Sequence, residues 1–157
     1  MRIGELCKSP VFVAYPDQAL AVAAREMRAR DVGALVVVAR GEPEQRPLGI
    51  LTDRDIVRGQ VNQLADLHCL AVSDVMTRQP LCIGADAGLS EAIATLASRA
   101  VRRAPVIDAG GALIGIVTLD DLLPAIAQQV RELADTVTPQ HRRRPYPVPE
   151  DVTLRGA

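Results

Sequence analysis

Residues 49–55 read GILTDRD, and residues 115–121 read GIVTLDD. Each stretch starts as an apolar strand and ends with a hydroxyl and a carboxylate three residues apart, Thr52 with Asp55 and Thr118 with Asp121. This combination predicts a buried strand that turns directly into a helix. Two such turns indicate an internal duplication, and a duplicated chain is expected to form a pseudo-two-fold molecule with two matching clefts.

The sequence on either side of the turns repeats as well. Each copy begins with residues 3–7 or 72–76 and continues with a short strand led by a proline, over 10–13 or 80–83. A helix opened by Asp17 or Asp86 follows. A buried strand follows at 32–38 or 101–107, a further strand ends in the turn, and a helix then begins. In the second copy, 108–111 predicts a tight hairpin turn between those strands. The predicted fold class is α/β (α+β), with two pseudo-symmetric strand–helix–strand–strand–helix repeats packed through their sheets.

These repeats divide the chain into segments. We expect a first repeat over 1–63, a connector over 64–71, a second repeat with a C-terminal helix over 72–135, and a disordered tail over 136–157. The tail is expected to be disordered because it combines several prolines with the arginine run 142–144. Pro124 falls inside the last helix, where its missing N–H should kink or restart the helix.

The composition narrows the class of protein. Apolar residues make up 48% of the chain but aromatic residues only 2%, so the core must be aliphatic. The formal net charge of −1 gives no global attraction to nucleic acid or to an anionic membrane. No apolar stretch reaches the roughly 18 residues that span a bilayer, and the N-terminus lacks the apolar run of a signal peptide. Three cysteines without a CxxC pair fit a reduced compartment, so a cytoplasmic location is expected.

The doubled pattern resembles a tandem pair of cystathionine-β-synthase (CBS) domains, the Bateman module, of the stand-alone bacterial type. The resemblance covers Ile3 to about Gln128 and rests on the element order, on the two Gly-x-x-Thr-x-x-Asp turns, and on the stretches 32–37, 73–77 and 103–108. It implies a regulatory module that binds adenosine-containing ligands of the AMP, ADP and ATP class in clefts between the repeats. It also implies a homodimer, with an effector protein in another chain receiving the signal.

The resemblance assigns roles to particular residues. Asp55 and Asp121 would accept hydrogen bonds from ribose hydroxyls, and Thr52 and Thr118 would lie close to the phosphate. The adenine would lie against residues of the first strand and of the lead-in to the second: Val13, Ala14, Gly33, Ala34 and Leu35 in one half, and Ile83, Gly84, Ala104 and Pro105 in the other.

The residues themselves support part of this assignment. A carboxylate one turn into a helix can hold a ribose diol, and a helix N-terminus favours phosphate. Arg102 and Arg103 add positive charge near the second cleft, where the first has Gly33 and Ala34. We therefore expect unequal clefts, with phosphate favoured beside the arginines. The same Thr-x-x-Asp spacing also fits a helix capping box, so capping and ligand binding both remain open.

Other functions have weaker support in the sequence. A metal site could be assembled from His68 and Cys69 with Cys7 or Cys82, and the run 142–144 could contact RNA, but neither pattern is specific. The two histidines, His68 and His141, support no nucleophile–base arrangement, so we expect no enzyme, no catalytic residues and no metal. An adenine nucleotide is expected as a regulatory ligand, without any required cofactor. The alternative is a ligand-free dimerisation or protein-interaction module.

Overall fold

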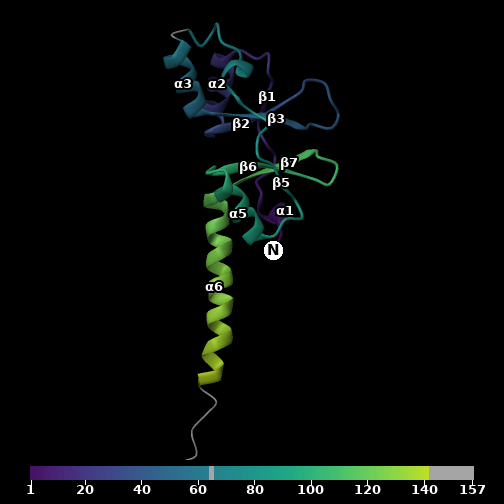
Figure 1. The fold of residues 1–157 in the computed structure, drawn as a ribbon, viewed down its shortest axis with the longest axis vertical. Coiled ribbons are helices and arrows are strands. Elements are labelled where there is room, and N and C mark those ends of the chain that lie inside the picture. The colour runs from purple at the N-terminus through teal and green to yellow at the C-terminus, as the bar shows by residue number, and fades with distance from the viewer. Residues whose placement is uncertain (64–65, 142–157) are drawn as a thin grey trace, which may run out of the picture. The chain divides into compact units, whose positions relative to one another are not determined.

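The computed structural model describes residues 1–63 and 66–141 (Figure 1). Its chain forms two compact units, Met1–Leu123 and a second unit that begins at Pro124. The first unit contains both sheets of the repeat. Its two sheets face each other, with helices α2 (Leu20–Ala29) and α3 (Asp53–Gln63) beyond the first sheet and α5 (Leu89–Ser98) beyond the second. The predicted α+β fold of two repeats packed through their sheets is confirmed.

The two sheets repeat the same strand order. The first contains β1 (Val13–Ala14), β2 (Ala34–Val38), β3 (Pro47–Thr52) and β4 (Thr77–Arg78), and the second contains β5 (Ile83–Gly84), β6 (Arg103–Ile107) and β7 (Leu113–Thr118). In both, the first strand runs parallel to the second and the second antiparallel to the third. The register shifts at matching places, between Val37 and Val38 in the first sheet and between Val106 and Ile107 in the second. The duplication therefore extends to the hydrogen-bond register.

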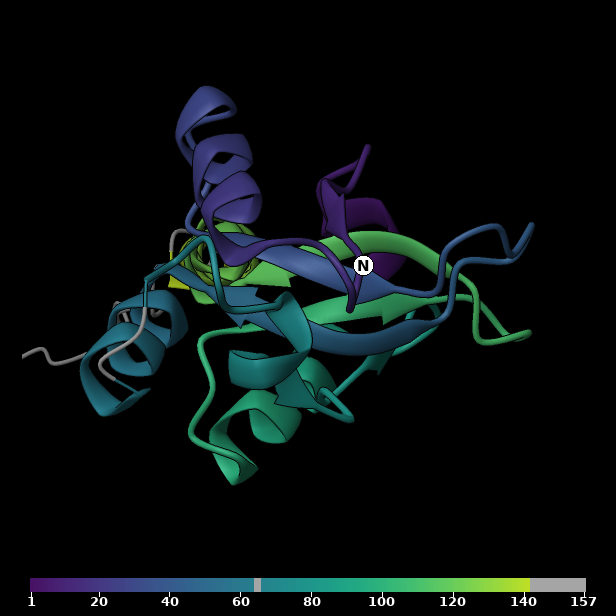
Figure 2. The same cartoon turned by 90° about the horizontal axis from the view of Figure 1, so that it is seen from above.

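The loops that connect the antiparallel strands also correspond. The β2–β3 and β6–β7 loops lie side by side (Figure 2), and the Leu113 N–H donates to the Gln45 carbonyl over 2.8 Å. The predicted tight turn between β6 and β7 is present, because Asp108 Oδ1 accepts from the N–H groups of Gly110 and Ala112, both at 2.9 Å. The two hairpins are thus joined to each other as well as to their own sheets.

The helices start later than the sequence predicts. Asp17 and Asp86 do not open α2 and α5, which begin at Leu20 and Leu89. Both aspartates precede the helices in turns, and their carboxylates pair instead with Arg40, at 3.4 Å, and with Arg2, at 2.6 Å. The proline-led strands are also shorter than predicted, since β1 and β5 start only at residues 13 and 83. Proline lacks the N–H that a sheet ladder needs.

The core is aliphatic, as predicted. One face of each long helix packs on its own sheet, and Leu20, Ala23 and Met27 of α2 are buried together with Leu35 and Leu51. Leu89, Ala92 and Leu96 are buried on α5 in the same positions. These spacings match the i, i+3, i+7 pattern of an amphipathic helix, so burial follows the sequence period.

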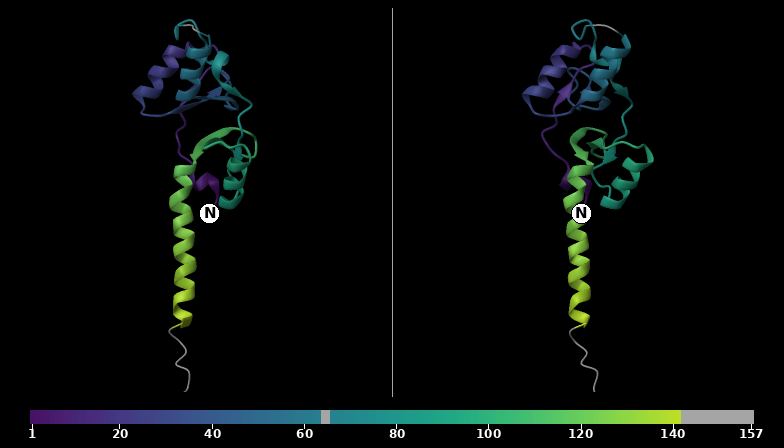
Figure 3. Two further views of the ribbon diagram at one scale, coloured as in Figure 1. Left: turned by 60° about the vertical axis from the view of Figure 1, so that its left-hand side comes forward. Right: turned by 90° about the vertical axis from the view of Figure 1, so that its left-hand side faces the viewer.

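The first residues of each copy pack against the sheet of the other copy. We call residues 3–8 the first head and residues 72–78 the second head; they include the short helices α1 (Ile3–Leu6) and α4 (Val72–Val75). The first head lies against the second sheet (Figure 3), where the Ile3 N–H donates to the Ala87 carbonyl and Lys8 pairs with Ile116. The second head lies on the first sheet, where β4 pairs with β3. A packed half of the first unit therefore combines the sheet of one sequence copy with the head of the other copy.

The last helix, α6 (Leu119–His141), runs through Pro124 without restarting, so the predicted restart is wrong. Pro124 lies near the start of the helix, where the ring removes only one N–H bond. Residues 136–141, predicted as disordered tail, are helical. The rest of that predicted tail, with the arginine run 142–144, lies outside the described residues. In the described part of the chain, no helix has the length and apolar character needed to cross a membrane.

Candidate functional site

Both repeated turns are reciprocal capping boxes. Asp55 Oδ2 accepts hydrogen bonds from the Thr52 N–H, at 2.9 Å, and the Thr52 hydroxyl, at 2.7 Å, while the Asp55 N–H donates back to Thr52 Oγ1. Asp121 and Thr118 repeat this arrangement at 2.9 and 2.6 Å. The capping interpretation is therefore confirmed, and such a cap stabilises a helix by about 1 kcal/mol.

The first cleft, which we call the Asp55 cleft, has a volume of about 290 Å³. It lies where the first turn meets the second head and residues 100–102, which we call the lead-in to β6. Its lining residues are Ile50, Thr52, Asp53, Arg54, Asp55, Thr77, Ala100, Val101, Arg102 and Arg103.

The second cleft, which we call the Thr118 cleft, has a volume of about 630 Å³. It is the pseudo-symmetric counterpart of the Asp55 cleft, because here the second turn meets the first head and residues 31–33, the lead-in to β2. Its lining residues are Lys8, Ser9, Pro10, Val11, Phe12, Asp31, Val32, Gly33, Ala34, Arg103, Ile116, Thr118 and Asp120.

The two lead-ins are positioned by matching helix ends. Asp31 and Ala100 follow α2 and α5 with left-handed φ values of 52° and 51°. The N–H of Val32 donates to the Met27 carbonyl, and the N–H of Val101 donates to the Leu96 carbonyl, which closes each helix in a Schellman motif. The same backbone reversal thus places each lead-in between the turn of its own copy, to which it is hydrogen-bonded, and the turn of the other copy.

This arrangement extends the predicted grouping of residues. Arg102 and Arg103 lie beside the second turn, as expected, because the Leu119 N–H donates to the Arg102 carbonyl at 2.9 Å and Arg103 pairs with Thr118. Both also line the Asp55 cleft with the first turn, and Arg103 lines the Thr118 cleft as well. Arg102 keeps a link to the second turn through Asp120, at 4.0 Å between exposed side chains. Gly33 and Ala34 likewise lie beside the first turn, as expected, since the Asp53 N–H donates to the Gly33 carbonyl at 3.3 Å and Ala34 pairs with Thr52, and both also line the Thr118 cleft. Each lead-in therefore contacts the turn of its own copy and also lines the cleft at the turn of the other copy, and this second neighbour was not predicted.

Most of the predicted adenine environment lies away from both clefts. Ala14, Leu35, Ile83, Ala104 and Pro105 are buried. Val13 and Gly84 lie in β1 and β5, and among the described residues none of these seven lines either cleft. These seven residues form part of the strands and of the buried core.

Lys8 distinguishes the two turns, and sequence reasoning missed it. Its Nζ lies 2.8 Å from Asp121 Oδ1. Burial raises the pKa of Asp121, but the hydrogen bonds from Lys8 and Thr118 outweigh it, so the pKa of Asp121 is lowered overall. The hydrogen bond to Asp121 in turn raises the pKa of Lys8. Aligning the heads places Lys8 opposite Thr77, and this comparison could have identified the difference.

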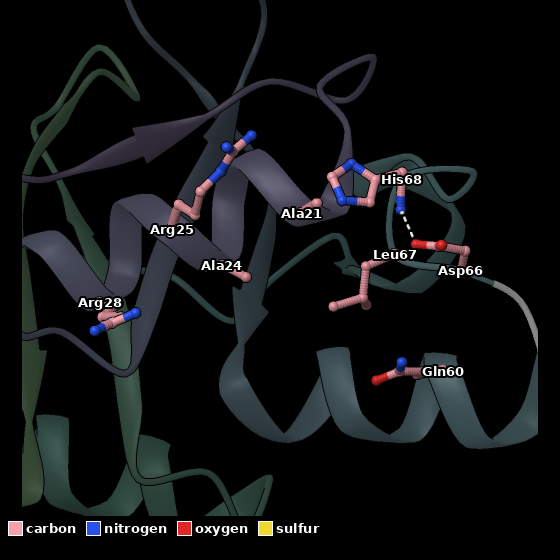
Figure 4. Close-up of a pocket in the computed structure, with 8 residues that line it drawn as sticks. All are labelled: Ala21, Ala24, Arg25, Arg28, Gln60, Asp66, Leu67 and His68. Carbon is pink, nitrogen blue, oxygen red and sulfur yellow. Dashed lines mark hydrogen bonds between the residues drawn. The ribbon is translucent and has the colours of Figure 1, made fainter.

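A third groove lies in the first repeat, between α2, α3 and the end of the connector (Figure 4). Ala21, Ala24 and Leu67 give it an apolar floor, Arg25 and Arg28 lie along α2, and the His68 N–H donates to Asp66 Oδ1 at 2.9 Å. Its volume is about 720 Å³, but it contains none of the predicted site residues. The described residues also hold no group of three or more His, Cys, Asp or Glu side chains suited to a metal.

The CBS domain family model matches residues 3–62 and 72–128, which are the two copies without their connector. A protein of Methanopyrus kandleri is 31% identical over 123 residues, covering 78% of this chain and 61% of that protein. The matched region is therefore less than two thirds of that relative's length.

Solved structures share the fold. A CBS domain protein from Pyrobaculum aerophilum, complexed with AMP, superposes with a TM-score of 0.73 at 25% identity, covering 84% of this chain and 99% of the other. A putative signal-transduction protein with CBS domains from Burkholderia ambifaria superposes with a TM-score of 0.71 at 25% identity, covering 80% and 93%.

Proposed function

The chain belongs to the CBS domain family, with two such domains in tandem, and from this premise we propose that it is a regulatory module that binds an adenosine-containing nucleotide. The observation that carries the proposal is the duplicated turn. The first turn lines one cleft between the two repeats with Thr52 and Asp55, and the second turn lines the other with Thr118, whose hydroxyl is hydrogen-bonded to Asp121. The AMP-bound state of the Pyrobaculum aerophilum relative supports the same ligand class.

The Asp55 cleft contains groups suited to the ribose and to the phosphate of a nucleotide. Asp55 offers a carboxylate to the ribose hydroxyls. Arg54, Arg102 and Arg103 line the same cleft and offer guanidinium groups, which bind phosphate oxygens in pairs. The N-terminus of α3 adds a favourable dipole. In this proposal the threonines act first as caps, and Asp55 both caps a helix and holds the ligand.

We further propose that the module forms a homodimer in the cytoplasm and passes its ligand state to an effector protein. Three large apolar side chains of the first unit support association, since Val57 is 61%, Val61 is 65% and Leu123 is 59% exposed. Val57 and Leu123 occupy matching positions, two residues after each repeated aspartate. Exposed apolar residues on matching helices are typical of an association surface.

The experiment is a calorimetric titration of the protein with AMP, ADP and ATP, repeated on Asp55→Asn, Asp121→Asn and the double variant. Asparagine keeps the side-chain shape and one carbonyl oxygen for the cap, but it loses the charge and acceptor capacity that a diol needs. We expect the wild-type protein to bind and the double variant to lose about tenfold or more in affinity. Thermal unfolding without ligand serves as the control for folding.

The alternative is a ligand-free interaction module. The capping boxes favour it in one respect, because they account for Thr52, Asp55, Thr118 and Asp121 without any ligand. Absence of binding for all three nucleotides, by a wild-type protein that unfolds cooperatively, would replace the nucleotide proposal with this one.

A further inference from the structure

We propose that the two clefts are not equivalent, and that Lys8 closes the Thr118 cleft to ribose by occupying Asp121, so that each chain binds one nucleoside, in the Asp55 cleft. This inference rests on the proposed nucleotide function and specifies it. The two turns are nearly identical in sequence and geometry, so the difference has to come from what reaches each carboxylate.

Counting acceptor sites separates the two aspartates. An ionised carboxylate has about four lone-pair sites. In each turn, Oδ2 accepts two hydrogen bonds from the threonine. Asp55 Oδ1 accepts no hydrogen bond from any described residue, whereas Asp121 Oδ1 is held by Lys8 at 2.8 Å. A ribose diol donates two hydrogen bonds, so Asp55 has the capacity for it and Asp121 does not.

The position of Lys8 is fixed by the fold. Its N–H donates to the Ile116 carbonyl at 2.9 Å, and the Ile116 N–H donates back to the Lys8 carbonyl at 3.1 Å. This pair holds the Lys8 backbone beside β7, close to the turn that starts at Thr118. The Asp121 side chain is only 10% exposed, and Lys8 lines the cleft while Asp121 does not. The ammonium group therefore lies between the cleft and its carboxylate.

The Asp55 cleft has no such group at the matching position. Thr77 pairs with Ile50 in β3 as Lys8 pairs with Ile116 in β7. Thr77 is exposed and uncharged, and it lines its cleft together with Asp55. Size does not explain the difference, because the Thr118 cleft is the larger of the two. One residue pair, Lys8 and Thr77, thus accounts for the asymmetry.

The test uses adenosine, which has the ribose but no phosphate that could draw Lys8 away from Asp121. Calorimetry should give one adenosine per wild-type chain, lost in Asp55→Asn and retained in Asp121→Asn. Lys8→Met should add a second site. Thr77→Lys should remove the first site, because it places an ammonium opposite Asp55 as Lys8 is placed opposite Asp121. The double variant Lys8→Met with Thr77→Lys should bind one adenosine, now lost on Asp121→Asn instead.

Lys8→Arg is the matched control, since it keeps the charge and should keep the Thr118 cleft closed. Two equal sites in the wild-type protein would overturn the inference, and so would a Lys8→Met variant that still binds one adenosine; both leave the nucleotide function standing. If no variant binds adenosine or AMP, the proposed function itself fails, and the inference fails with it.

Discussion

At the scale of single residues, the repeated threonines and aspartates stabilise helices before they meet any ligand. Thr52 with Asp55 and Thr118 with Asp121 close the same set of hydrogen bonds, so capping alone cannot explain a difference between the clefts. Lys8 supplies that difference through its ion pair with Asp121. The chemistry of a repeated motif therefore depends on a residue outside the motif.

The Lys8–Asp121 pair predicts a pH dependence of stability. The pKa of Asp121 is lowered from 3.8, so its contribution is present above that value and lost as pH falls through the lowered pKa. The pKa of Lys8 is raised from 10.5, so its contribution is present below that value and lost as pH rises through the raised pKa. We expect wild-type protein to exceed Lys8→Met in unfolding free energy by less than about 1 kcal/mol, because the lysine is solvent-screened.

Urea denaturation near neutral pH and at both extremes measures this difference. The difference in unfolding free energy between the wild-type protein and Lys8→Met should be largest and constant near neutral pH. It should decrease toward both acid and alkaline pH. A difference that is constant at every pH, or that grows toward either extreme, would contradict the ion-pair account. Lys8→Arg should follow the wild-type curve on the acid side.

At the scale of elements, the exchanged heads explain the first glycine of each motif. A Cβ added at Gly49 would lie 2.7 Å from Met76 Sδ and 2.9 Å from the Thr77 carbonyl oxygen. A Cβ at Gly115 would lie 2.8 Å from Cys7 Cβ and closer still to its Sγ. Each head therefore crosses the glycine of the opposite sheet, and the motif needs glycine for close approach rather than for a turn.

Gly115→Ala should destabilise the protein by about 1–3 kcal/mol, because the new methyl group overlaps Cys7 in a packed contact. Chemical denaturation measures the loss. Adding Cys7→Gly should recover part of it, since both conflicting atoms are removed. Gly84→Ala is the control: a Cβ there meets nothing within 4 Å, and its effect should stay within about 0.5 kcal/mol. Equal losses at both positions would contradict the close-approach explanation.

At the scale of the whole molecule, association is the remaining proposal. Val57, Val61 and Leu123 leave apolar surface exposed on α3 and at the start of α6. Light scattering should find a dimer, and Val57→Asp combined with Leu123→Asp should produce a folded monomer, because burying two carboxylates in an apolar contact is costly. Leu48→Asp, at a 42% exposed apolar position outside these helices, should leave the dimer intact. A wild-type monomer would contradict the proposal.

Much of the local structure could be predicted from the sequence. The alternation of strands and helices, the buried faces of α2 and α5 and both capped turns depend on residues within a few positions of each other. The helix starts were predicted wrongly because Asp17 and Asp86 are used in ion pairs with distant arginines. The secondary structure of the heads, α1, α4 and β4, was not predicted, because each element is too short to show a period of its own.

The sequence by itself determined that there are two copies and that each turn carries a capped carboxylate, because both features depend on repeated residues that lie close together in the chain. Only the tertiary structure decided which residues share a cleft. The heads cross between the copies and each lead-in lies between both turns, so Arg102 and Arg103 line a cleft with Asp55, and Lys8 pairs with Asp121. The physical reason is that the apolar faces of each half are buried only when residues of the other half pack on them. Which residues do so is determined by packing across the whole unit rather than by local spacing in the sequence.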